Sequence, residues 1–172
     1  MKIVVCHAGK FFICLLVLAA FQVRAGTAMA SEESLMVSDM HATAFNYFFR
    51  DGDMDFHFGN LVLGSAVNGG VEIGEAFYAA SHIKDGDAAS WQREWFELAR
   101  RAEKRGEDSL AAGHAVSARD QLLRAANYYR ISLISMLPDD PAFQERGRKL
   151  RRLFRKAGAL FDPPVEYFEA PF

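Results

Sequence analysis

Apolar residues recur at intervals of three and four along most of this chain, which is the spacing that places side chains on one face of an α-helix. The clearest example runs from Gly113 to Arg130, where a Gly-His break precedes a long apolar stripe. This stripe consists of Val116, Leu122, Ala125, Ala126, Tyr129, Leu133 and Met136. No long stretch alternates Val and Ile as a buried strand would. The pattern therefore predicts an all-α fold.

Turn and capping signals divide the remaining apolar pattern into further helices. Asn68-Gly69-Gly70 marks a turn, and aspartates in Asp85-Gly86-Asp87 and in Pro138–Pro141 can cap the helices that follow. Short connections between consecutive helices predict a bundle of about five antiparallel helices. The expected helices are Met40–Phe49, Val71–Ile83, Ala88–Leu110, Gly113–Arg130 and Pro141–Leu160.

The last residues have a different pattern. Asp162-Pro163-Pro164 ends the helical region, and Val165–Phe172 alternates apolar and polar residues as a strand does. We therefore expect the bundle to be followed by an extended C-terminal segment.

The first thirty residues have the pattern of a secretory signal peptide. A basic head, Met1–Lys10, precedes the apolar run Phe11–Phe21 and a small-x-small end at Ala28-Met29-Ala30. We expect cleavage after Ala30, with Ala25 as a weaker site, and export to the periplasm or the medium. The alternative is an uncleaved membrane anchor, although the run is shorter than the roughly 20 residues of a membrane span. Both cysteines, Cys6 and Cys14, lie here, so the mature chain would hold no disulfide or thiolate.

Charge is distributed unevenly along the chain. Acidic residues dominate Ser31–Asp87, whereas the helix expected at Pro141–Leu160 is strongly basic. We expect this basic face to be solvated or to dock on the acidic half, with an anionic membrane or a partner domain as alternatives. A slightly negative net charge in an exported chain argues against nucleic-acid binding. Membrane contact is then expected only through the signal peptide.

A metal or cofactor site is not expected. Asp51–Asn60 resembles a calcium loop, but Phe56 and Val62 occupy the positions that need Gly and a bidentate Glu. The segment fits the start of a helix with capping aspartates better than a calcium loop. His57 could be a packed or surface residue, part of a substrate cavity, or a metal ligand, but it has no partner at ligand spacing. The glycines near Gly69 lack the context of a phosphate-binding loop.

Several residues together resemble the helical N-terminal domain of one branch of the α/β-hydrolase superfamily. They are Trp91, Trp95, Gly113-His114, Ser117-Ala118-Arg119 and Arg124–Arg130. That branch includes the fermentation/respiration switch esterase-like proteins, 2,6-dihydroxypseudooxynicotine hydrolase and fungal polyketide-shortening pigment hydrolases. The resemblance runs from about Phe45 to Phe172. It implies a helical cap-like domain at 31–161, and at 162–172 the start of a catalytic domain that is truncated in this chain.

The chemistry of such hydrolases needs a serine in Gly-x-Ser-x-Gly followed by an acid and a histidine. The chain has no Gly-x-Ser-x-Gly, and the positions of the family's triad would lie beyond residue 172. We therefore assign no catalytic residue. The resemblance implies that these helices enclose the substrate of an ester or carbon–carbon bond hydrolase. The implied partner is a catalytic domain that is missing or on a separate chain, or a small-molecule substrate shared with that domain. By aromatic type and helical position, the candidate pocket residues are Phe56, Phe58, Trp91, Trp95, Tyr128 and Tyr129.

A stand-alone periplasmic interaction module is the alternative function. Antiparallel helical hairpins also resemble tetratricopeptide solenoids, although no convincing repeat recurs at a spacing of about 34 residues. The two functions differ in one observable property. A cap should expose a large apolar patch where a catalytic domain packs, whereas a complete module should not.

Overall fold

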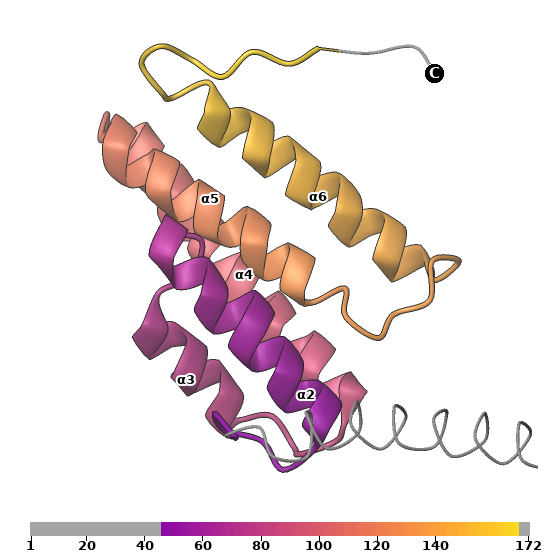
Figure 1. Ribbon diagram of the computed structural model, residues 1–172. Coiled ribbons are helices and arrows are strands. Elements are labelled where there is room, and N and C mark those ends of the chain that lie inside the picture. Colours follow the sequence, from indigo (N-terminus) through magenta and orange to yellow (C-terminus); the bar gives the residue numbers. More distant parts are fainter. Residues whose placement is uncertain (1–45, 169–172) are drawn as a thin grey trace, which may run out of the picture. The chain divides into compact units, whose positions relative to one another are not determined.

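The computed structural model describes residues 46–168, and residues 1–45 and 169–172 lie outside the described part. The described residues are helical and contain no strand (Figure 1). This confirms the all-α prediction for that part, whereas the predicted signal peptide falls outside it. The elements are α2 (Gly52–His57), the π-helical turn η1 (Phe58–Val62), the 3-10 turn η2 (Leu63–Asn68), α3 (Ile73–Ser81), α4 (Ala88–Ala111), α5 (Ala115–Ile131) and α6 (Pro141–Gly158).

Aspartates cap three of the helices, as predicted. The Asp51 side chain accepts from the Met54 N–H at 2.8 Å at the start of α2. Asp87 accepts from the Ala89 N–H at 3.0 Å before α4, and Asp140 accepts from the Ala142 N–H at 2.8 Å before α6. Each carboxylate satisfies one of the donors that a helix start leaves unpaired. These short local signals explain why the starts of α4 and α6 follow from the sequence.

The turn between α4 and α5 is built around Gly113, which has φ of 78°. The Gly113 N–H donates to Leu110 O at 3.0 Å, and the His114 N–H donates to Ser109 O at 2.9 Å. This is the bonding pattern of a helix C-terminus closed by a left-handed residue, for which glycine is favoured. The predicted helix boundary at Gly113-His114 is thus confirmed.

The helix expected at Met40–Phe49 is wrong over its described end. Residues 46–49 are not helical, and Met40–Phe45 lie outside the described residues. The buried Asp55 carboxylate accepts from the backbone N–H groups of Tyr47, Phe48 and Phe49 at 2.9, 2.8 and 2.8 Å. Because these donors point at one side chain, they cannot donate to carbonyls of a preceding helical turn.

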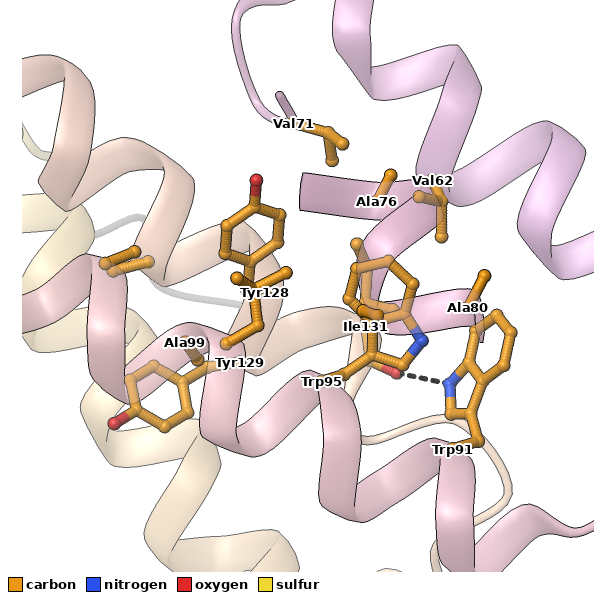
Figure 2. Packing of buried hydrophobic residues seen from close by; sticks show 14 of the residues in the cluster. Val62, Val71, Ala76, Ala80, Trp91, Trp95, Ala99, Tyr128, Tyr129 and Ile131 are labelled. Atoms are coloured by element: carbon orange, nitrogen blue, oxygen red, sulfur yellow. Dashed lines mark hydrogen bonds between the residues drawn. The ribbon is translucent and has the colours of Figure 1, made fainter. Parts of the chain in front are cut away.

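The core lies where α4 packs on α5. Trp91 and Trp95 are buried on α4, with ring centroids 5.6 Å apart, and Tyr128 of α5 lies 6.0 Å from Trp95. The Trp91 indole N–H donates to Ile131 O at 3.0 Å, as Figure 2 shows. Small residues let the two helices approach closely. Ala118, Ala125 and Ala126 are buried, and the apolar face of α5 therefore forms the centre of the fold.

Two details of the predicted apolar stripes are wrong. Val116 is exposed, and α5 ends at Ile131, so Leu133 and Met136 lie beyond the helix. The spacing in Pro141–Leu160 also predicts an apolar stripe, made of Phe143, Gly147, Leu150, Phe154, Ala157 and Phe161. The deepest large side chain of α6 is instead Leu153, and Phe154 is half-exposed. A pattern of spacings identifies a helix but fixes its buried face only to within about a residue.

Three basic residues of α6 contact α4 and the end of α5. Arg152 pairs with Glu103 at 2.5 Å, and Lys156 pairs with Glu107. Arg146 Nη1 donates to Gln92 O and Ser132 O at 3.1 and 3.0 Å. Among the described residues, the acidic partners of α6 therefore come from α4, while Arg148, Arg151 and Arg155 are exposed, as expected for a solvated face.

After α6, residues 159–163 form a turn and a bend, and residues 164–168 continue without regular secondary structure and form no strand. The segment turns back beside α6 (Figure 1). The Val165 N–H donates to Gly158 O at 3.0 Å, and the Tyr167 hydroxyl donates to Phe154 O at 3.3 Å. The end of α6 thus positions residues 165–167.

Candidate functional site

The six aromatic residues proposed as pocket residues mostly lie inside the bundle. Phe56 is half-exposed, and the other five are buried: Phe58, Trp91, Trp95, Tyr128 and Tyr129. Figure 2 shows four of these five packed against neighbouring aliphatic residues. Only Trp91 also lines one of the cavities described below. In this arrangement the buried residues stabilise the fold, and their contact with a substrate stays a prediction.

The hydroxyl of Tyr128 connects α5 to α3. It donates to Glu75 Oε2 at 2.8 Å and accepts from the Glu72 N–H at 3.0 Å. Arg105 of α4 pairs with the same Glu75 carboxylate. Burial raises the pKa of the Tyr128 hydroxyl above its ordinary value, and the bond to Glu75 raises it further. The hydroxyl therefore stays protonated and serves as a structural donor.

Tyr129, the next residue of α5, forms a similar connection to other helices. Its hydroxyl donates to Glu103 Oε2 at 2.7 Å and accepts from Lys149 Nζ at 3.4 Å. Burial and the bond to Glu103 raise the pKa of this hydroxyl as well. Tyr129 thus joins α4, α5 and α6, and its proton is committed to Glu103. Neither tyrosine has the environment of a catalytic base or nucleophile.

A cavity of about 290 Å³ lies between η2, α5 and α6. We call it the α5–α6 cavity. Its size is near the lower end of the roughly 300–1,000 Å³ typical of small-molecule pockets. Its lining combines an apolar surface with a polar edge and contains one charged side chain. The lining residues are Ser65, Asn68, Gly70, Leu123, Ala126, Asn127, Arg130, Leu150 and Phe154.

The polar edge of the α5–α6 cavity is a hydrogen-bonded network around Arg130. Arg130 Nε donates to Asn127 Oδ1 at 2.9 Å, and Nη2 donates to Ser65 Oγ at 3.4 Å. Asn127 Nδ2 donates to Gly70 O at 3.0 Å, while the Ser65 hydroxyl donates to Leu61 O at 2.5 Å. Within residues 46–168, Arg130 forms no ion pair with an acidic side chain. The edge therefore carries an uncompensated positive charge.

Sequence reasoning missed this cavity. Ser65 and Arg130 are 65 positions apart, and no local motif connects them. The available signals were Asn68-Gly69-Gly70, which we treated as a turn, and the arginine that ends the central helical stretch. Only the packing of η2 on α5 brings the two signals together.

A second cavity of about 220 Å³ lies beside His57. Asp53, Trp91 and Ser135 also line it. His57 Nδ1 is buried and has no hydrogen-bond partner within the described residues. Three interpretations were left open for His57. The structure shows that His57 is partly buried and borders a cavity made by the described residues. Its contact with a substrate stays a prediction.

No three or more His, Cys, Asp or Glu side chains in residues 46–168 come together in a way that could hold a metal ion. None of the helices in that part is both long and apolar enough to cross a bilayer.

The chain is similar to several fungal hydrolases. Hydrolase ORFZ of Pyricularia oryzae is 37% identical over 132 residues, which cover 74% of this chain and 31% of that protein. The 20-hydroxy-prefusarin hydrolase FUS2 of Gibberella moniliformis is 36% identical over 135 residues, which cover 77% of this chain and 31% of that protein. Alpha/beta hydrolase gkaG of Penicillium citrinum is 37% identical over 111 residues, which cover 64% and 26%. No family model matches the chain.

These comparisons confirm the predicted resemblance to α/β hydrolases. The chain spans at most about a third of the length of these relatives, since the matched share is 26–31%. The described residues are helical, and they correspond to part of a hydrolase-like protein.

Proposed function

We propose that the described helices, which are homologous to part of the fungal α/β hydrolases, pack on an α/β-hydrolase catalytic domain and enclose one side of its substrate pocket. The proposal is supported by a match that covers 31% of hydrolase ORFZ. In this proposal the catalytic domain supplies the nucleophile, acid and base, and the helices supply the cover. That domain belongs either to the same protein or to a separate chain.

An exposed aromatic surface beside α6 is the observation that carries this proposal. We call it the C-terminal aromatic patch and define it as Phe154, Val165, Tyr167 and Phe168, which are 49%, 42%, 44% and 85% exposed. The rings of Phe154 and Tyr167 lie 6.4 Å apart. Because backbone and side-chain hydrogen bonds hold Val165 and Tyr167 on α6, the patch is a formed surface. Exposed apolar residues gathered at the end of one helix are often part of an interaction site.

Positive charge borders the C-terminal aromatic patch. The Arg155 guanidinium lies 5.5 Å from the Tyr167 ring centre, and Arg148 and Arg151 are exposed on the same helix. Within the described residues, none of these three arginines forms an ion pair. An apolar centre with a cationic rim favours a partner surface that is apolar and bordered by acidic residues.

A chimeric hydrolase tests the proposal. Residues 46–168 of this chain would replace the aligned part of hydrolase ORFZ, and unfolding and hydrolysis of p-nitrophenyl acetate would be measured. We expect one cooperative unfolding transition and retained hydrolysis. A soluble chimera with two separate transitions and no activity, beside an active unaltered ORFZ, would contradict the proposal.

Substitutions in the patch sharpen this test. Changing Tyr167 and Phe168 to Asp in the chimera should uncouple the two parts, because it buries two charges in the proposed interface. Leu137→Asp is the matched control, since Leu137 is 70% exposed and lies in the connection before α6, away from the patch. Equal effects of the patch and control substitutions would locate the interface elsewhere.

We also propose that the chain is exported. The support is the basic head, the apolar run Phe11–Phe21 and the Ala28-Met29-Ala30 end. Residues 1–45 placed before a reporter phosphatase that is active only outside the cytoplasm should give activity. Leu15→Arg with Leu16→Arg should abolish it, because the changes interrupt the apolar run. Equal activity without residues 1–30 would refute export by this segment.

A further inference from the structure

The α5–α6 cavity has the composition of a site for a small amphipathic anion. Its apolar surface comes from Leu123 and Ala126 of α5 and Leu150 and Phe154 of α6. Arg130 is the one charged residue among its lining residues. A ligand that fits both surfaces needs an apolar body and a single negative charge. A doubly charged phosphate would be only partly neutralised here.

Hydrogen bonds orient the guanidinium of Arg130, which is exposed at the edge of the cavity. A guanidinium has five N–H donors, of which the bonds to Asn127 and Ser65 use one on Nε and one on Nη2. Asn127 is itself oriented by its bond to Gly70, and Ser65 by its bond to Leu61. Donors therefore remain on Nη1 and Nη2. Preorganised donors of this kind lower the ordering cost of binding.

The geometry of the free donors favours a carboxylate. The two terminal nitrogens of a guanidinium form a planar fork that matches the two oxygens of a carboxylate. An acidic side chain of the protein would compete for this fork, but within residues 46–168 Arg130 forms no ion pair. The positive charge is thus available to a ligand.

We propose that the α5–α6 cavity binds a small molecule with an apolar, ring-sized body and one carboxylate, with Arg130 as the charge partner. The carboxylate bonds to Nη1 and Nη2, while the body contacts Leu123, Leu150 and Phe154. This site belongs to the described helices alone. It therefore goes beyond the proposed function and does not depend on a catalytic domain.

A matched pair of probes tests the site. The ¹⁵N-labelled chain is titrated with 2-naphthoate and with 2-naphthalenemethanol, which share the ring system and differ in the charge of the head group. Amide shifts in the NMR spectrum give both the affinity and the location. We expect naphthoate to bind at least about tenfold more tightly than the alcohol, because hydrogen bonds to charged groups are stronger than those between neutral groups. The largest shifts should fall at Ala126, Asn127 and Leu150.

Arginine variants separate charge recognition from apolar binding. Arg130→Met should weaken naphthoate at least tenfold and leave the alcohol within about twofold, since the side chain keeps its length and loses its charge. Arg130→Lys keeps the charge without the fork and should give an intermediate affinity. Arg148→Met is the control, because Arg148 is exposed on α6 and does not line the cavity.

Several results would overturn the assignment. Equal affinity of the chain for the two probes would show that the charge plays no role in binding. Amide shifts confined to other helices would show that the probes bind elsewhere. Naphthoate binding by Arg130→Met at the wild-type affinity would exclude Arg130 as the partner. A failure to bind naphthoate at all would refute the site, while the docking proposal would remain open to the chimera test.

Discussion

Two helical glycines should respond in opposite directions to replacement by alanine. Gly106 lies on α4, where an added Cβ would come within 2.8 Å of Leu122 Cδ2 and 3.2 Å of the Leu122 backbone nitrogen. Gly147 lies on α6, where the nearest atom to an added Cβ is the far end of Arg151 at 3.7 Å. Both residues are buried inside helices. The pair therefore compares a crowded site with an open one.

The magnitudes follow from two opposing terms. Alanine favours a helix over glycine by about 1 kcal/mol, whereas overpacking a core costs about 1–3 kcal/mol. Gly147→Ala should gain most of the helix-propensity energy without any overpacking cost, and so stabilise the fold by roughly 0.5–1 kcal/mol. Gly106→Ala should lose roughly 1 kcal/mol, because Leu122 and the α5 backbone must move away from α4.

Urea unfolding followed by circular dichroism at 222 nm gives the free energy of unfolding of each variant. The comparison requires that this free energy depends on urea concentration with the same slope in both variants. A loss of about 1 kcal/mol would lower the melting temperature by several degrees. Equal stabilisation by both substitutions would refute the reasoning. It would mean that α4 and α5 do not approach each other closely at Gly106.

Three further predictions concern polar groups that hold the bundle. Asp55→Asn should destabilise the fold by about 1–3 kcal/mol, because a carboxylate that accepts three backbone N–H groups is lost, and urea unfolding would measure it. Trp91→Phe should cost about 1–2 kcal/mol in the same assay, through the lost indole bond and the smaller ring. Because folding raises the pKa of Tyr128 and Tyr129, their contribution to stability is complete below the unfolded tyrosine pKa of about 10 and falls as pH rises above it. The melting temperature should therefore fall more steeply between pH 8 and about 11 in the wild type than in a variant with both tyrosines changed to Phe.

Local signals explain which parts of the fold could be predicted. Asp87 before α4, Gly113-His114 before α5 and Asp140 before α6 each act within a few residues, so the sequence contains them whole. The segment at Phe48-Phe49 was misassigned because its apolar residues have helical spacing, while its backbone donors are taken by the later Asp55. A contact between separate segments cannot be recognised from spacing alone.

The candidate site was less predictable than the fold. Trp95, Tyr128 and Tyr129 were selected by their type and helical position, but these properties do not distinguish a core residue from a cavity wall, and all three are buried. The α5–α6 cavity depends on η2 meeting α5, so Ser65 and Arg130 carry no shared signal in the sequence. Site prediction needed the tertiary contacts.

The central claim is that these helices serve an α/β-hydrolase catalytic domain. The most direct test is to read the genomic DNA beyond the Phe172 codon, in all frames and in the adjoining genes. We predict a sequence that encodes Gly-x-Ser-x-Gly followed by Asp and His in the order of these hydrolases. The absence of such a sequence from both the continuing frames and the neighbouring genes would contradict the claim and favour a stand-alone helical module.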